Sequence, residues 1–134
     1  MAQQKYRIAT IGSHSALQVF KGAHDEGFKT IAVCKKGSER PYKMFNSADE
    51  IISINSYKEF PKIQNELIKK NAIVVPHASF VTYMGYEEVE KLKVMYYGNK
   101  KILKWESDRH LERQWLKNAG LKMPSLFKNP KDID

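Results

Sequence analysis

The stretch "TIGSHSAL", residues Thr10 to Leu17, joins two patterns of different period. Before it, Tyr6–Ile11 is a largely apolar run that is typical of a buried strand. After it, apolar residues recur at helical spacing on one face of residues 16–27. Gly12 permits a sharp turn and a close approach of the backbone between the two segments. The stretch therefore predicts the first strand–turn–helix unit of an α/β fold.

The same alternation continues along the chain. Helices are expected from Phe60 to about Lys70 and in "YEEVEKLK", residues 86–93. Further strands, most of them rich in Ile, Val and Ala, are expected at Phe28–Cys34, Glu50–Asn55, Ala72–Pro76 and Lys93–Gly98. Strands and helices that alternate at this spacing form βαβ units. We therefore expect a Rossmann-like parallel sheet with helices on both faces.

The pattern changes at Ser107, which is expected to cap a helix that runs to Ala119. Gly120 and Pro124 follow this helix as a C-terminal stop. The tail after Pro124 has no periodicity and is typical of a linker. We therefore expect an α/β substrate-binding domain at residues 1–106, with a helix and linker at residues 107–134.

The composition and charge of the chain limit the classes of function that it can have. The net charge is +8, from 23 Lys and Arg against 15 Asp and Glu, but acidic residues are interleaved and no aromatic-rich RNA-binding motif is present. Basic residues cluster at Lys35–Lys43, Lys69–Lys70 and Lys100–Lys104. A solvated surface explains these clusters best, a site for a small phosphate-bearing ligand comes next, and nucleic acid third. No apolar run approaches the roughly 20 residues that span a bilayer, and Met1–Arg7 is too short and polar for a signal peptide, so a cytoplasmic location without membrane contact is expected. Cys34 is the only cysteine and is expected to be a buried small hydrophobe.

Polar side chains follow two of the expected strands. Ligands of open parallel sheets bind at the carboxyl ends of the strands. The first strand is followed by a glycine and three polar residues whose N–H groups would open a helix, an arrangement that favours an anion. The fourth is followed by His77 and Ser79, which suggests one shared site. The candidates at the first strand end are Gly12, Ser13, His14 and Ser15.

Other interpretations of these strand ends are open. Ser13 or Ser15 could simply cap the helix, and His14 could be a surface residue. A metal site on His14 and His77 is disfavoured because no third ligand has suitable spacing, and a Ser–His nucleophile is disfavoured because no G-x-S-x-G elbow is present. His24 and His110, within helices, are expected on the surface.

The basic loop "KKGSERPYK", residues 35–43, opens on the same edge of the sheet. Lys36, Tyr42 and Lys43 are candidates to anchor the phosphate of a sugar phosphate, whereas Arg40 could equally face solvent. Exposed apolar residues near the fourth strand are candidates for an interface in a homo-oligomer. These residues are Phe80, Val81 and Tyr83.

Four segments together resemble a known family. They are "IATIGSHSAL", "KKGSERPYKMF", "IVVPHASFVTYMG" and "YGNKKILKWESDRHLERQWLKNAGLKMP", in this order along almost the whole chain. They are similar to the N-terminal portion of the archaeal-type, formate-dependent ligases that act on aminoimidazole carboxamide ribonucleotide (AICAR), the PurP family. That family belongs to the ATP-grasp superfamily, so the resemblance implies a pre-ATP-grasp domain that leads toward an ATP-grasp module.

The resemblance also implies a reaction. Family members use ATP, with Mg²⁺ or Mn²⁺, to activate formate as formyl phosphate and then formylate AICAR to FAICAR in purine (IMP) biosynthesis. By motif, His14 and Ser79 match AICAR-contacting positions, and Arg109 matches, more loosely, a basic residue near the nucleotide. The lysine, glycine-rich flap and acidic metal ligands of the ATP-grasp lobes do not occur in residues 1–134, so no catalytic residue, metal ligand or bound cofactor is expected in this chain.

Three hypotheses follow. The first is a substrate-binding domain for AICAR, either a fragment of the ligase or free-standing, that is inactive alone. The second is a regulatory or interaction module of the same fold without the chemistry. The third is a basic RNA-binding protein, whose affinity would fall steeply with salt.

Overall fold

The computed structural model describes residues 5–127, 129 and 131. The chain divides into two compact units, Met1–Lys101 and Ile102–Asp134, and each is described by itself. No helix in the described part of the chain combines the length and the apolar character needed to cross a membrane.

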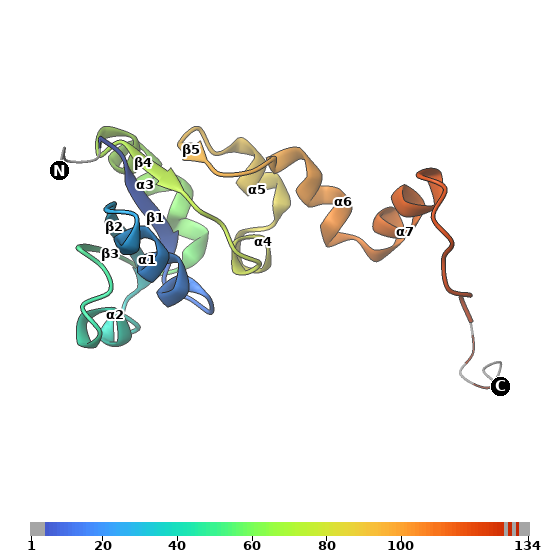
Figure 1. Ribbon diagram of the computed structural model, residues 1–134, viewed down its shortest axis with the longest axis horizontal. Helices are drawn as coiled ribbons and strands as arrows, with labels where there is room; N and C mark the ends of the chain where they lie inside the picture. The colour runs from blue at the N-terminus through green and yellow to red at the C-terminus, as the bar shows by residue number, and fades with distance from the viewer. Residues whose placement is uncertain (1–4, 128, 130, 132–134) are drawn as a thin grey trace. The chain divides into compact units, whose positions relative to one another are not determined.

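The first unit is built on a five-stranded sheet (Figure 1). Its strands are ordered β3-β2-β1-β4-β5, and all neighbouring strands are parallel. The bounds are β1 (Arg7–Ile11), β2 (Lys29–Lys35), β3 (Glu50–Ile54), β4 (Ala72–Val74) and β5 (Met95–Tyr96). The α/β fold with a parallel sheet, expected from the alternating pattern, is confirmed.

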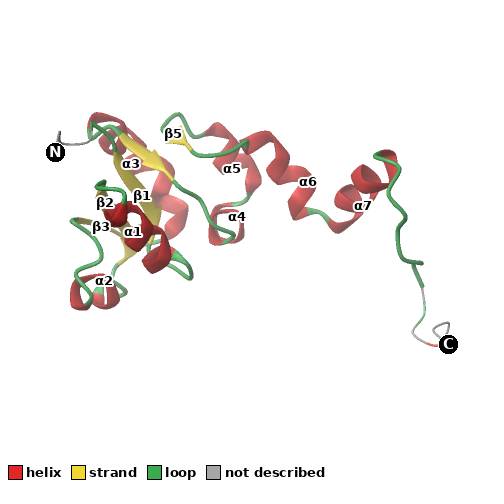
Figure 2. Cartoon of the chain, in the orientation of Figure 1, coloured by secondary structure: helices red, strands yellow, loops and turns green. Residues whose placement is uncertain are grey.

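Helices cover both faces of this sheet (Figure 1). Helix α1 (Ala16–Asp25) packs on β1 and β2, and α3 (Phe60–Lys69) packs on β4. From β1 to β2 the chain moves toward the β3 edge of the sheet, whereas from β3 to β4 it moves toward the β5 edge. Because both crossovers are right-handed, α1 and α3 lie on opposite faces. Short helices complete the connections, as Figure 2 shows. They are α2 (Arg40–Met44), η1 (Tyr57–Glu59), α4 (Ser79–Met84) and α5 (Tyr86–Lys91).

The core follows the alternation of side chains along β2. Ala32 and Cys34 face the α1 side, where they pack with Phe20 and Tyr42. Ile31 and Val33, on the opposite face, are also fully buried. Both faces of β2 are therefore apolar, as expected of an interior parallel strand.

Two short helices correct the predicted boundaries. The basic loop contains α2, and "PHASF" enters α4 at Ser79, a helix that the sequence analysis did not predict. Phe80 is 0% exposed because its ring packs edge-on against Phe60 at 5.4 Å, so its predicted place at an exposed interface is wrong. The strands β4 and β5 are also shorter than predicted.

The second unit contains α6 (Leu103–Ser107) and α7 (Arg109–Asn118), preceded by the turn η2 (Lys100–Ile102). The predicted N-cap, Ser107, is wrong because Ser107 is the last residue of α6. Asp108 caps α7 instead, and its Oδ1 accepts hydrogen bonds from the backbone N–H groups of His110 (2.8 Å) and Leu111 (3.2 Å). The cap lowers the pKa of Asp108 through these two bonds.

Candidate functional site

The strand order places the switch point of the sheet at β1, and we call the edge beyond the carboxyl end of β1 the crevice. Strands β2 and β4 both neighbour β1, but the chain leaves β1 toward α1 on one face and reaches β4 from α3 on the other. The segments that follow β1 and β4 leave adjacent parallel strands at the carboxyl edge, which is where open α/β sheets bind ligands. These segments hold residues 12–15 and 75–78.

The structure brings the two strand ends together through hydroxyl groups. Ser13 Oγ lies 3.4 Å from Ser79 Oγ and 3.3 Å from Tyr83 Oη. Ser13 follows β1, whereas Ser79 and Tyr83 belong to α4, which follows β4. Ser79 is 3% exposed and Ser13 is half-buried. We call Ser13, Ser79 and Tyr83 the hydroxyl cluster; two of its three members were predicted as site residues.

Two side-chain donors hold the end of β1 in place. Tyr57 Oη donates to the Gly12 carbonyl (2.6 Å), and His77 Nε2 donates to the Ile11 carbonyl (3.1 Å). Burial holds the pKa of His77 below its usual value. The bond to Ile11 raises this pKa and the charge of His14 lowers it, but both effects are smaller than that of burial. His77 is therefore neutral at pH 7, with its proton on Nε2, and it positions the backbone of β1.

Gly12 is required by the core beneath the crevice. A Cβ at this position would lie 2.7 Å from Cys34 Sγ and 2.8 Å from Tyr42 Cε2. Tyr42 is 6% exposed, its ring packs edge-on against Phe20, and burial raises its pKa to about 12. The sequence analysis missed this packing role of Tyr42; its role as a phosphate anchor stays a prediction.

The remaining predicted residues are exposed. His14 has a left-handed backbone (φ 34°) and faces solvent, and Ser15 precedes α1 without a side-chain capping bond. Lys36 and Lys43 are exposed near the carboxyl end of β2, and neither has an ion-pair partner among the described residues. Arg109 lies in the second unit, where it pairs with Glu112 at 3.2 Å. Binding roles for these five residues stay predictions.

A pocket of about 420 Å³ opens beside the hydroxyl cluster. Tyr83 belongs to both, and its ring stacks on Tyr57 with centroids 4.8 Å apart. Sequence reasoning missed this pocket, although Tyr57 follows a strand end, and it assigned Tyr83 to an interface. The lining residues are Lys35, Asn55, Ser56, Tyr57, Lys58, Thr82 and Tyr83.

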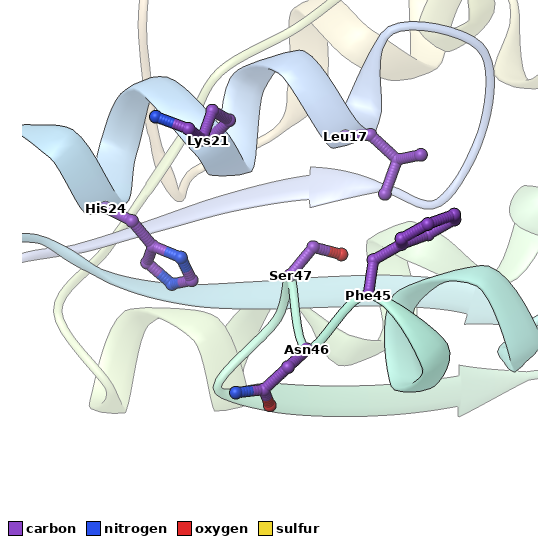
Figure 3. Close-up of a pocket in the computed structure, with 6 residues that line it drawn as sticks. All are labelled: Leu17, Lys21, His24, Phe45, Asn46 and Ser47. Carbon is purple, nitrogen blue, oxygen red and sulfur yellow. The ribbon is translucent and has the colours of Figure 1, made fainter.

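A second pocket, of about 300 Å³, lies between α1 and the segment after α2 (Figure 3). Leu17 and the exposed ring of Phe45 line one part of it, and Lys21 and His24 line another. Lys21 is paired with Asp25 Oδ1 at 2.5 Å, so its charge is already compensated.

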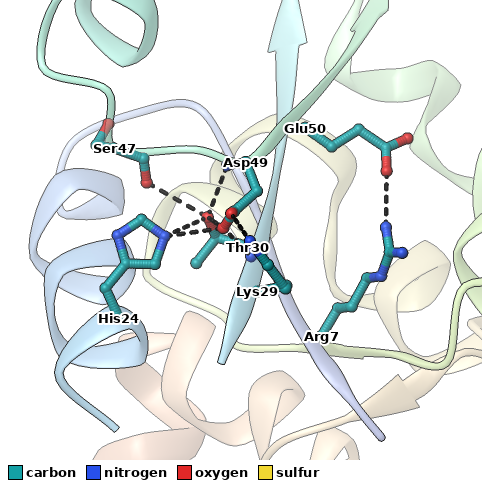
Figure 4. Close-up of polar contacts among 7 residues, drawn as sticks. All are labelled: Arg7, His24, Lys29, Thr30, Ser47, Asp49 and Glu50. Atoms are coloured by element: carbon teal, nitrogen blue, oxygen red, sulfur yellow. Dashed lines mark hydrogen bonds and ion pairs between the residues drawn. The ribbon is translucent and has the colours of Figure 1, made fainter. Parts of the chain in front are cut away.

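His24, expected on the surface, is exposed and belongs to a polar network (Figure 4). Its Nε2 lies 2.9 Å from Asp49 Oδ2 and 3.1 Å from Thr30 Oγ1. The network joins the C-terminal part of α1 to the amino ends of β2 and β3. It therefore lies at the edge of the sheet opposite the crevice, and its role is structural.

The residues required for a metal ion do not gather in the described part of the chain. No group of three or more His, Cys, Asp or Glu side chains is arranged there to hold one. The hydroxyl groups and the exposed histidine at the crevice can donate and accept hydrogen bonds, which suits a neutral or anionic organic ligand.

The comparison with protein families gives a match over most of the chain. Residues 8–127 match the family described as "Protein of unknown function (DUF1246)". A curated relative from Methanococcoides burtonii, named 5-formaminoimidazole-4-carboxamide-1-(beta)-D-ribofuranosyl 5'-monophosphate synthetase, is 50% identical over 129 residues. The alignment covers 95% of this chain but 36% of the relative, so the chain spans about a third of the length of the curated relatives it matches.

Solved structures share the fold. The crystal structure of the IMP biosynthesis protein PurP from Thermococcus kodakaraensis is similar with a TM-score of 0.77 and 33% identity, over 92% of this chain and 40% of that one. N5-carboxyaminoimidazole synthetase from Staphylococcus aureus, in complex with ADP, has a TM-score of 0.70 and 20% identity, over 92% of this chain and 32% of that one. The second likeness shows the fold alone.

Proposed function

The chain belongs to the DUF1246 family and matches the N-terminal domain of the PurP proteins, and from this premise we propose that it binds the ribonucleotide substrate of an AICAR-formylating ligase. The relatives are named for the formylated product, which AICAR becomes when its amine gains a formyl group. In the whole ligase, ATP would activate formate as formyl phosphate, and the amine would displace the phosphate as the new C–N bond forms. Activation is needed because formate itself is unreactive toward amines.

The observation that carries the proposal is the hydroxyl cluster. Ser13 and Ser79 come from two strand ends, 66 residues apart, and meet at the crevice. Serine hydroxyls both donate and accept, which suits the ribose hydroxyls and the carboxamide of AICAR. His14, exposed beside them on the turn after β1, adds a ring that can donate or accept.

The rest of the catalytic machinery is proposed to lie outside these residues. Positioning the weakly nucleophilic amine against an activated formyl group is the contribution a substrate domain makes to such a reaction. We propose that ATP and its metal ion bind the parts of the ligase that this chain does not span. The chain alone would then bind AICAR without turning it over.

Titration calorimetry of the chain with AICAR tests this proposal. We expect saturable binding, weakened roughly tenfold in His14→Ala and in Ser79→Ala, because each substitution removes a polar contact. His110→Ala is the matched control, since His110 is an exposed histidine of the second unit. Absence of heat with AICAR while an unrelated nucleotide binds would reject the proposal, as would equal affinities of wild type and His14→Ala.

A further inference from the structure

The 420 Å³ pocket shares one residue, Tyr83, with the hydroxyl cluster. Tyr83 contributes its hydroxyl to the cluster, 3.3 Å from Ser13 Oγ, and its side chain to the wall of the pocket. Tyr57 forms the adjoining wall and bonds the Gly12 carbonyl. Tyr83 is therefore shared by the hydroxyl cluster and the wall of this pocket.

Two lysines supply the charge of the pocket. Lys35 alternates with Ile31 and Val33 along β2, so it lies on the face opposite Cys34, and Lys58 belongs to η1. Neither lysine forms an ion pair with any described residue, whereas several other lysines of the chain do. Two lysines without an ion pair among the described residues thus belong to the lining of one cavity.

The carboxylates of the adjoining segments are engaged elsewhere. Glu59 Oε2 accepts hydrogen bonds from Asn55 N (3.0 Å) and Asn55 Nδ2 (3.2 Å), and its other oxygen lies 3.6 Å from Lys62 Nζ. Glu39 accepts from Ser53 Oγ at 2.7 Å and from the Gly37 N–H at 2.8 Å. Neither carboxylate pairs with Lys35 or Lys58, so the pocket keeps its positive charge.

We propose that this pocket binds the phosphate group of the ribonucleotide, with Lys35 and Lys58 as its two cationic contacts. The inference rests on the proposed function, since it places the sugar and base at the hydroxyl cluster and the phosphate beyond Tyr83. Lysine binds phosphate as a mobile point charge, and two such groups match the charge of a phosphate monoester. The assignment differs from the one drawn from the sequence, because Lys36 and Lys43 do not line this pocket.

Affinities of lysine variants for AICAR and for its dephosphorylated nucleoside test the assignment. Lys35→Ala and Lys58→Ala should each lower the affinity for AICAR roughly tenfold and leave the affinity for the nucleoside unchanged. Lys62→Ala is the matched control, because it removes a neighbouring exposed lysine that pairs with Glu59 outside the pocket. All three lysines are exposed, so the variants should keep the fold, which circular dichroism verifies.

Two results would overturn the assignment while leaving the proposed function intact. One is a loss of AICAR affinity in Lys36→Ala or Lys43→Ala but not in Lys35→Ala or Lys58→Ala. The other is an equal loss of affinity for the nucleotide and the nucleoside in Lys35→Ala and Lys58→Ala, which would show that these lysines do not contact the phosphate.

A titration with inorganic phosphate separates the inference from the proposed function. In amide NMR spectra of the chain, phosphate should shift the signals of residues 35, 56–58 and 82–83 saturably, and the shifts should vanish in the Lys35→Ala/Lys58→Ala double variant. Such shifts support the phosphate site even if AICAR does not bind, an outcome that rejects the proposed function alone. Shifts confined to residues 36–43, or none, overturn the site.

Discussion

At the residue scale, Gly12 connects the core to the crevice. Its N–H donates to the Val33 carbonyl at 2.7 Å, and its own carbonyl accepts from Tyr57 Oη at 2.6 Å. Its Cα faces Cys34 and Tyr42 at a distance that leaves no space for a methyl group. The position of Ser13 and His14 therefore depends on the absence of a side chain at residue 12.

Gly12→Ala should destabilise the chain by about 1–3 kcal/mol, because the added methyl group must displace the buried Cys34 and Tyr42 side chains. Urea unfolding followed by circular dichroism measures the change. Gly22→Ala is the control, because Gly22 lies within α1 with no atom within 4 Å of the added Cβ. The free energy of unfolding of Gly22→Ala should be higher than that of wild type by roughly 0.5–1 kcal/mol. A Gly12→Ala protein as stable as wild type would contradict the close packing.

At the scale of elements, Asp49 links α1, β2 and β3 by hydrogen bonds at the amino edge of the sheet, opposite the crevice (Figure 4). It accepts hydrogen bonds from Thr30 N (2.8 Å), Lys29 Nζ (2.8 Å) and His24 Nε2 (2.9 Å). Burial raises the pKa of Asp49, but the bonds from Lys29, His24 and Thr30 together outweigh burial and hold the pKa below its usual range. The ionised carboxylate is therefore the form that stabilises the fold.

Asp49→Asn should lower the free energy of unfolding at pH 7 by about 1–2 kcal/mol, because charge-assisted bonds are lost. A carboxyl group with a depressed pKa stabilises the fold above its unfolded pKa, about 3.9, and the effect is lost as the pH falls through the folded pKa. The difference in the free energy of unfolding between wild type and Asp49→Asn should therefore become smaller below about pH 4. Urea unfolding at pH 7 and pH 3 measures it.

Asp25→Asn serves as the control for Asp49→Asn, because Asp25 forms a surface pair with Lys21 one helical turn away. Such pairs contribute about 0.3–0.5 kcal/mol. The network does not hold an ionised Asp49 if Asp49→Asn lowers the free energy of unfolding equally at pH 7 and pH 3. The same conclusion follows if it lowers this free energy no more than Asp25→Asn does.

At the scale of the whole molecule, stability is concentrated in the first unit. All five strands and all the buried hydrophobic residues of the described chain lie within residues 1–101. The second unit consists of short helices with large apolar side chains that are 38% to 68% exposed. These side chains are Trp105, Trp115, Leu121, Leu126 and Phe127.

A fragment of residues 1–101 should therefore fold on its own and unfold in urea near the midpoint of the whole chain. Far-UV circular dichroism follows this transition. Both tryptophans of the chain, Trp105 and Trp115, lie in the second unit, so their fluorescence in the whole chain reports on that unit separately. A fragment that lacks a cooperative transition would show that residues 102–134 are part of the folding unit.

The sequence by itself determined the α/β class, the parallel sheet and two members of the hydroxyl cluster. These features follow from local rules: apolar period distinguishes strands from helices, and the polar residues after β1 and β4 must fall on the carboxyl edge of a parallel sheet. The short helices α2 and α4 escaped prediction because one or two turns are stabilised by tertiary packing more than by their own sequence.

Only the tertiary structure decided which residues surround the crevice. Tyr57 reaches Gly12 across 45 residues, Tyr83 reaches Ser13 across 70, and Phe80 is buried against Phe60. No local period encodes these contacts, because they depend on the order of the strands and on which face each helix covers. The same order brings Lys35 and Lys58 to one pocket, whereas the sequence directed attention to Lys36 and Lys43.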